Sequence, residues 1–387
     1  MSERVYFDWN ATAPLREEAR AAVTSALGLT GNASSVHAEG RAARRLVEDA
    51  RAQVAALVGA EPKDVTFTSG ATEANTLALT PAIETAGEKR RRDRLFVSAI
   101  EHASVLCGGR FAPGDVEMIP VDREGLVDRQ ALGAAIARAE RPLVSVMLAN
   151  NETGVIQPIA EIAKIVHAAN GILHVDAVQG PGRIACDIEA LSADLMTISS
   201  HKLGGPQGAG ALIRRGDLHI TEPLIHGGGQ ERGLRGGTEN VAGIAGFGAA
   251  AKTAAAARQS EAAHMAKLRD RLEAGLKVVT PHAVIFGADA ARLPNTALFA
   301  MPGMKAETAI IAFDLNGIAV SSGAACSSGK VQASHVLAAM GVDPALARGA
   351  VRVSVGWSST EGEVERFLGT WNKLAESLLK ERRGIAA

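Results

Sequence analysis

Lys202 lies in a short polar loop, Ser199-Ser200-His201-Lys202-Leu203-Gly204-Gly205-Pro206, between two apolar, strand-like runs at 194–198 and 210–214. Burial disfavours the charged ammonium form, so a lysine held between buried strands can lose its proton at neutral pH. A neutral amine is the form that makes a Schiff base with an aldehyde cofactor. A solvated surface lysine fits this loop equally well, and only the rest of the chain can decide between the two.

Other polar groups stand where predicted strands end or predicted helices begin. The segment Thr68-Ser69-Gly70-Ala71-Thr72-Glu73 opens a helix, where backbone N–H groups and hydroxyls can cradle a phosphate, although an ordinary capped helix start looks the same. His102 follows an apolar strand and is suited to stack on an aromatic ligand or carry a proton, or to serve only structure. Asp176 ends another strand and needs a cation there, either a protonated pyridine nitrogen or Arg183. Arg352 interrupts an apolar strand and should have a carboxylate or phosphate partner.

The three cysteines, Cys107, Cys186 and Cys326, are far apart in the sequence. An odd number without a CxxC pair argues against a disulfide framework and against a zinc site, so no metal is expected. Cys326 lies in a small, polar, loop-like segment, 321–329, whereas Cys107 is expected in a helix and Cys186 just after a turn. Cys326 is therefore the candidate nucleophile.

The composition limits what kind of protein positions these groups. The chain has 387 residues, of which 47% are apolar, and a net charge of -1. A large core is expected, and a nucleic-acid binder or an anionic-membrane binder is not. The first residues lack the features of a signal peptide, and no apolar run approaches the roughly 18 residues of a membrane span. These features predict a soluble, cytoplasmic protein.

Strands and helices alternate after residue 64, which predicts an α/β fold with a mostly parallel sheet. In such sheets ligands bind at the carboxyl ends of the strands, where the polar groups fall. An alanine-rich helix, about 241–276 with a break near Gly246 or Gly248, should lead to a smaller α+β unit. Strands are predicted at 65–68, 95–100, 116–121, 143–149, 172–178, 195–199 and 209–214, and in the smaller unit at 283–286, 296–300, 318–321 and 351–355. A long helix is predicted after the loop 31–37 and should end near 58. Further helices are predicted at 16–27, 72–86, 128–139, 159–169, 307–316, 335–340 and 360–382.

These groups together describe pyridoxal phosphate acting on an amino acid. They are a phosphate cradle, an aspartate for a ring nitrogen, a histidine for a ring face, a Schiff-base lysine and an arginine for a carboxylate. Each signal is weak alone, but their joint order on an α/β chain is much stronger.

The chain resembles the cysteine desulfurases of the NifS/IscS type, in the class V aminotransferase group of fold-type I pyridoxal phosphate enzymes. The resemblance extends from Val5 to the final helix. It implies a large cofactor-binding domain at 16–250 and a small domain formed by 1–15 and 251–387. The motifs that carry it are YFDWNATAPL, GNASSVHAEGR, FTSGATEAN, EHASVL, NNETGVIQPI, HVDAVQ, SSHKLGGPQGAGAL, GGGQERGLRGGTEN and SSGAACSSG.

The resemblance implies a role for each cofactor-site residue. Lys202 would form the Schiff base, Asp176 would pair with the pyridine nitrogen and Gln179 would contact the ring hydroxyl. His102 would stack on the ring and shuttle protons. Thr238 would reach the phosphate of a neighbouring subunit, which implies a homodimer. The other residues expected to bind the cofactor are Ala71, Thr72, Asn151, Ser199, Ser200 and His201.

Substrate binding and sulfur transfer follow from the same resemblance. Asn32, Asn151 and Arg352 would bind the substrate carboxylate, and Cys326 would accept the sulfur. The expected reaction converts L-cysteine to L-alanine and leaves a persulfide on Cys326 for an iron–sulfur scaffold or another sulfur acceptor. Ala33 departs from the family pattern, which usually has proline there. The alternatives are a selenocysteine lyase, an aminotransferase of the same fold, and a non-catalytic scaffold in sulfur trafficking.

Overall fold

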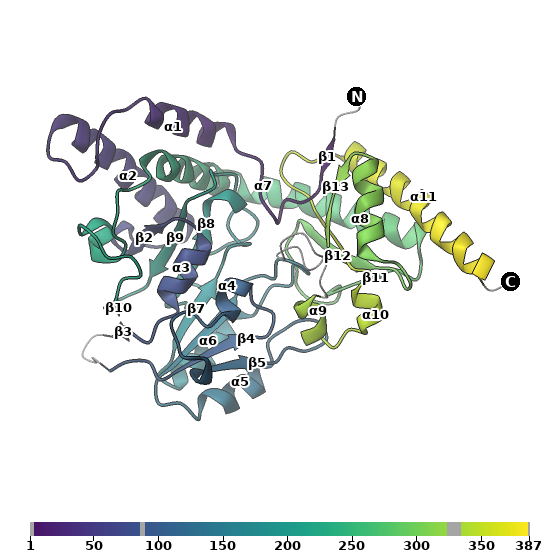
Figure 1. Cartoon of the computed structure of the whole chain (residues 1–387), viewed down its shortest axis with the longest axis horizontal. Helices are drawn as coiled ribbons and strands as arrows, with labels where there is room; N and C mark the ends of the chain where they lie inside the picture. Colours follow the sequence, from purple (N-terminus) through teal and green to yellow (C-terminus); the bar gives the residue numbers. More distant parts are fainter. Residues whose placement is uncertain (1–3, 86–89, 323–333, 386–387) are drawn as a thin grey trace.

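The computed structural model describes residues 4–85, 90–322 and 334–385, and its largest element is a seven-stranded sheet with the order β2-β9-β8-β7-β6-β4-β5 (Figure 1). Only β9 runs against its neighbours. Helices cover both faces, because strands buried on both sides cannot meet water. The predicted α/β fold with a mostly parallel sheet is confirmed. The strands are β2 (Val65–Thr68), β4 (Arg94–Ser98), β5 (Val116–Ile119), β6 (Pro142–Met147), β7 (Ile172–Asp176), β8 (Leu195–Ser199) and β9 (Gly210–Arg214).

The helices around this sheet follow the predicted pattern, with one error. The predicted helix 72–86 ends at residue 78, because a residue before proline is driven out of the helical region and Pro81 follows. Strand β3 (Ile83–Glu84) takes its place and pairs with β10 (His219–Ile220). The helices are α1 (Glu17–Leu27), α2 (Ala38–Leu57), α3 (Ala71–Ala78), α4 (Ala103–Leu106), α5 (Arg129–Ile136) and α6 (Ile159–Ala168).

Helix α7 (Val241–Val279) crosses from the large unit to the small one without a break (Figure 1). The predicted interruption near Gly246 or Gly248 is wrong. A Cβ at Gly246 would lie 2.5 Å from Val23 of α1, and one at Gly248 would lie 2.5 Å from the Cα atom of Ala50 of α2. These glycines permit close helix packing and do not end the helix.

The small unit is built on an antiparallel sheet of order β11-β12-β15-β14. The predicted strand at 318–321 is two short strands, because β13 (Ile318–Ala319) instead pairs with the N-terminal strand β1 (Val5–Tyr6). Thr360 and Glu363 form a capping box at the start of the last helix. The other elements are β11 (Val284–Ile285), β12 (Thr296–Ala300), β14 (Ser321–Ser322), β15 (Val351–Ser354), α8 (Ala306–Leu315), α9 (His335–Ala339), α10 (Pro344–Ala347) and α11 (Glu361–Ile385).

Two main apolar cores correspond to the two units. The first half of α7 packs in the core of the large unit, and its second half packs in the core of the small one. Val5 and Phe7 belong to the small core. The division at residue 250 lies inside α7 and stays a prediction. Within the described ranges, no helix is both long and apolar enough to cross a membrane.

Candidate active site

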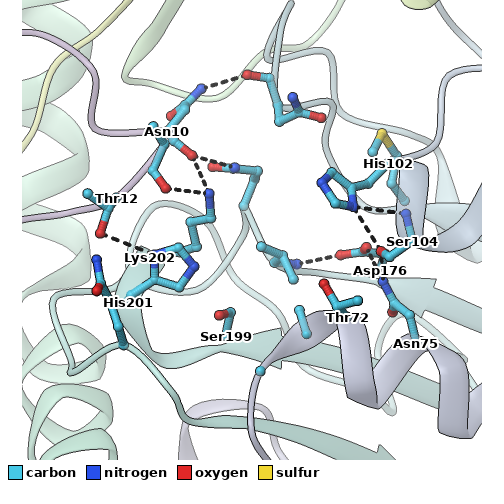
Figure 2. A pocket seen from close by; sticks show the side chains of 18 of the residues that line it. Asn10, Thr12, Thr72, Asn75, His102, Ser104, Asp176, Ser199, His201 and Lys202 are labelled. Carbon is cyan, nitrogen blue, oxygen red and sulfur yellow. Dashed lines mark hydrogen bonds between the residues drawn. The ribbon is translucent and has the colours of Figure 1, made fainter. Parts of the chain in front are cut away.

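A cavity of about 560 Å³ opens at the carboxyl ends of β6, β7 and β8 (Figure 2). Its volume is in the usual range for a small-molecule or cofactor site. The start of α3, the start of α4, the turn after β1 and Arg352 on β15 complete its walls. The large unit, the N-terminal segment and the small unit therefore all contribute to one site.

Lys202 ends a short 3-10 turn, Ser200–Lys202, that follows β8 directly. Its Nζ donates hydrogen bonds to the backbone carbonyl oxygens of Asn10 (2.6 Å) and Ala11 (2.8 Å). Lys202 thus links the turn after β8 to the N-terminal turn after β1, at the wall of the cavity. Beside it, burial and then the charge of Lys202 lower the pKa of His201 to about 4. His201 is therefore neutral at neutral pH, with Nδ1 3.1 Å from the Thr12 hydroxyl oxygen.

Asp176 is the last residue of β7 and is almost completely buried. Its Oδ2 accepts a hydrogen bond from Asn75 Nδ2 at 2.9 Å, and its Oδ1 accepts one from the Val178 N–H at 3.1 Å. In the described part of the chain, no lysine or arginine forms an ion pair with it. A buried carboxylate with no cation is costly, so this position suits a ligand that carries a protonated nitrogen.

Arg183, the alternative partner for Asp176, bonds elsewhere. It donates to the side-chain oxygen of Gln179 and to the backbone carbonyl of Trp9. Burial lowers the pKa of Arg183 to about 10, which still leaves it charged at neutral pH. The guanidinium fixes the Gln179 amide, whose Nε2 donates to the Asn10 carbonyl at 3.1 Å. Gln179 therefore turns its NH₂ group toward the cavity wall that Lys202 also contacts.

His102 is the N-cap residue of α4. Its Nδ1 accepts a hydrogen bond from the Ser104 N–H at 3.2 Å and lies 2.8 Å from the Ser104 hydroxyl oxygen. His102 lines the cavity, and Figure 2 shows its ring beside Ser104, in the same part of the site as Asp176 and Asn75. A neutral histidine whose Nδ1 is an acceptor has its proton on Nε2.

The first turn of α3 forms a cradle of backbone N–H groups at the cavity floor. Gly210 on β9 comes so close that a Cβ there would lie 3.0 Å from the backbone nitrogen of Ala71. The Glu73 carboxylate accepts from the Ser69 N–H at 2.8 Å and pairs with Arg235 at 3.1 Å, which fixes the loop before the helix. Helix N-termini attract anions, so this corner suits a phosphate. The residues that line it are Ser69, Gly70, Ala71, Thr72, Ser199, His201, Gly208 and Ala209.

Arg352 reaches the cavity from β15 and is only 2% exposed. Its guanidinium donates to Asp8 Oδ1 at 2.7 Å and to the backbone carbonyl of Asn151 at 3.0 Å. The carboxylate partner that its strand position predicts is therefore Asp8. Because Arg352 also lines the cavity, it can meet a carboxylate that enters from solvent.

The structure brings most predicted site residues to this cavity: Ala71, Thr72, His102, Asn151, Asp176, Gln179, Ser199, His201, Lys202 and Arg352. Ser200 is fully buried outside the cavity lining, with its hydroxyl directed at Gly205. Asn32 and Thr238 are exposed and do not line the cavity either. Cys326 lies outside the described residues. Within those residues, no group of histidines, cysteines and carboxylates could hold a metal ion.

Sequence reasoning missed four side chains of the site, those of Asn10, Thr12, Asn75 and Ser104. All four line the cavity and bond to predicted site residues. Asn75 had a readable signal, because it lies four residues after Ala71 and so shares a helix face with the cradle. Asn10 and Thr12 lie in the N-terminal segment before α1 and Ser104 lies in the short helix α4, and nothing in their spacing indicates which strand end they will meet.

Comparisons with known proteins agree over almost the whole chain. The family model described as aminotransferase class-V matches residues 5–367. A cysteine desulfurase of Cereibacter sphaeroides is 41% identical, with 97% of each chain covered. A cysteine desulfurase IscS of Dictyoglomus turgidum is 38% identical, over 98% of this chain and 96% of its own. The X-ray structure of a NifS-like protein from Rickettsia africae superposes with a TM-score of 0.88 at 38% identity, over 97% of this chain and all of that one.

Proposed function

The chain belongs to the class-V aminotransferase family and is a pyridoxal 5′-phosphate-dependent cysteine desulfurase, and from this premise we propose the roles of its own residues. The observation that supports the proposal best is the convergence of Lys202, Asp176 and His102 on one cavity. When bound there, the cofactor supplies an aldehyde for amines and a ring that withdraws electrons from the substrate.

The cavity fits this cofactor on the evidence of its own groups. Asp176 is a buried carboxylate without a described cation partner and would hold the ring nitrogen. Gln179 presents a fixed NH₂ group and would contact the ring hydroxyl. His102 would lie against the ring. The phosphate would be held by Ala71 and Thr72 of α3 together with Ser199 and His201. Asn151 would be a further contact to the cofactor.

Lys202 would hold the aldehyde carbon and, once displaced by the substrate amine, would remove the α-proton with its Nζ. The backbone carbonyls of Asn10 and Ala11 accept hydrogen bonds from that Nζ in the structure. Two carbonyl acceptors stabilise the charged ammonium, so these groups would hold the amine in place after it has taken the proton.

The substrate would be oriented by its carboxylate. Arg352 supplies the guanidinium, and Asn151 and Asn32 would add amide donors. Asn32 lies outside the cavity lining, so its part requires the loop before α2 to approach the site.

Cys326 would accept the sulfur. Its thiolate attacks the substrate sulfur, an S–S bond forms and the Cβ–S bond breaks. The electron pair of the broken bond stays on the carbon and takes up a proton, which gives the methyl group of alanine. The thiol that Cys326 began with and the substrate sulfur together make the persulfide, so atoms and electrons balance without an added oxidant.

We also propose a cytoplasmic homodimer that passes its sulfur to an iron–sulfur scaffold or another acceptor protein. The exposed side chain of Thr238 supports the dimer, because an exposed hydroxyl outside its own cavity can reach a phosphate in the partner's cavity. The names of the relatives, IscS among them, support iron–sulfur assembly as the destination of the sulfur.

A spectrum and a product assay test the function. Purified protein should show the visible band of the bound cofactor and release alanine when cysteine is added. Cys326→Ser should keep the band and lose both alanine and sulfide formation, whereas Cys107→Ser, at an exposed cysteine, should keep both. Alanine release from Cys326→Ser at the unaltered rate would remove the nucleophile assignment. A preference for selenocysteine in a direct rate comparison would favour a lyase, and a colourless protein would favour a scaffold.

A further inference from the structure

Asn75 is a fully buried amide that touches two groups of the site at once. It lies on α3, and its Nδ2 is 2.9 Å from Asp176 Oδ2 and 2.9 Å from Ser104 Oγ (Figure 2). An NH₂ group has two protons, one for each of these acceptors. A flipped amide would set its oxygen against the carboxylate, so the donor orientation is the one that chemistry allows.

Ser104 passes this orientation on to His102. Its hydroxyl oxygen already accepts from Asn75, so its own proton turns to His102 Nδ1, which lies 2.8 Å away. The Ser104 backbone N–H donates to the same Nδ1 at 3.2 Å. An imidazole nitrogen that faces two donors is an acceptor, and the ring proton then stands on Nε2.

The carbonyl oxygen of the Asn75 amide is the atom that this arrangement leaves unsatisfied. In the described part of the chain, its Oδ1 is buried without a hydrogen-bond partner. Buried polar atoms are rarely left so, and an exception at a site calls for a reason. Both N–H bonds can be made only in this orientation, and the protein keeps them although the carbonyl oxygen remains unsatisfied.

We propose that Asn75 is a positioning residue that ties the Asp176 carboxylate to the His102 ring through Ser104 and holds His102 in the tautomer with its proton on Nε2. The hydrogen-bonded series Asp176–Asn75–Ser104–His102 positions two groups that would contact the cofactor ring. Asn75, within this series, lies on α3, the helix whose first turn forms the anion cradle. The proposal rests on the proposed function for the identity of the ligand and not for the hydrogen-bond chain.

Four variants of the holoenzyme test the chain: Asn75→Ala, Asn75→Asp, Ser104→Ala and, as a matched control, Thr76→Ala. The Thr76 hydroxyl bonds only to the Thr72 carbonyl of its own helix among the described contacts. The first readout is the tautomer of His102, from ¹⁵N NMR of histidine-labelled protein with the signal assigned by His102→Gln. The second is the dissociation constant of pyridoxal phosphate.

The unaltered protein should show His102 with its proton on Nε2. Asn75→Ala and Ser104→Ala should both raise the population of the tautomer with the proton on Nδ1, although the backbone N–H of residue 104 still favours the proton on Nε2. Asn75→Ala should also weaken cofactor binding about tenfold, the order expected for one lost hydrogen bond to a charged group, whereas Ser104→Ala and Thr76→Ala should change it less than twofold. Asn75→Asp keeps the size but sets a second carboxylate against Asp176, so it should bind the cofactor more weakly than Asn75→Ala.

The proposal is overturned if the unaltered His102 has its proton on Nδ1, or if Asn75→Asp binds the cofactor as well as Asn75→Ala. If the Asn75 variants do not fold, Ser104→Ala decides alone, because an unchanged tautomer population there contradicts a role for the Ser104 hydroxyl in the hydrogen-bonded series. None of these readouts depends on desulfurase turnover, so their failure would leave the proposed function standing, and loss of the function would leave them interpretable.

Discussion

Arg352→Ala should separate substrate binding from cofactor binding. In the structure the guanidinium lines the cavity and already bonds to Asp8 at 2.7 Å and Asn151 at 3.0 Å. A charge-assisted hydrogen bond to a substrate carboxylate contributes about 1.5–3 kcal/mol, which corresponds to roughly 10- to 150-fold in kcat/KM. Because two bonds of the guanidinium are already used within the protein, we expect the lower half of that range, expressed as a higher KM for cysteine.

The assay is alanine formation over a series of cysteine concentrations, with the cofactor band recorded on the same samples. The matched control is Arg292→Ala, which removes another arginine of the small unit that is paired with a carboxylate, Glu273, at 2.7 Å and lies outside the cavity lining. Both variants should lose thermal stability, but only Arg352→Ala should raise KM. An unchanged KM in Arg352→Ala, or an equal rise in both variants, would refute the assignment of Arg352 to the substrate carboxylate.

Two further outcomes follow from the site. Lys202→Ala should lose the band of the covalently held cofactor and slow alanine formation by at least about 10³-fold, measured by spectrum and amino-acid analysis, and a retained band would contradict the role of Lys202. Glu101, the residue before His102, is fully buried, and burial raises its pKa from 4.5 to about 8. The folded protein therefore holds a proton that the unfolded chain releases, and stability should fall as pH rises from about 4.5 through about 8. Glu101→Gln stays neutral, so its Tm between pH 5 and pH 8.5 should fall less than that of the unaltered protein, and parallel curves would contradict the raised pKa.

Much of the fold could be predicted because it is written in short local patterns. Strands β2, β8 and β12 begin and end at the residues predicted for them, since each is an apolar run bounded by polar or glycine-rich sequence. The errors have a different origin. Gly246 and Gly248 look like helix breakers in isolation, and only the helices packed against them show why they are glycines.

The candidate site divides in the same way. The strand-end positions of His102, Asp176 and Lys202 predict one shared cavity, because neighbouring parallel strands end at the same edge of a sheet. The residues that orient them could not be predicted, since Asn75 meets Asp176 across 101 positions and Asn10 meets Lys202 across 192. No local period encodes such contacts, and they appear only when the chain has folded.

During synthesis on the ribosome, the N-terminal turn that accepts hydrogen bonds from Lys202 emerges early, whereas several residues that bind this turn emerge late. The Asn10 carbonyl accepts a hydrogen bond from Lys202, and its side chain donates one to Thr296. Its backbone N–H donates to Ser354, which lies 344 positions later in the chain. A nascent chain that has reached Lys202 contains the cradle and Asp176 but not the strand β15 that fixes the turn. Contacts of such long sequence separation cannot form before the later partner has been synthesised. The N-terminal turn that accepts hydrogen bonds from Lys202 therefore completes its contacts only after β15 has been synthesised.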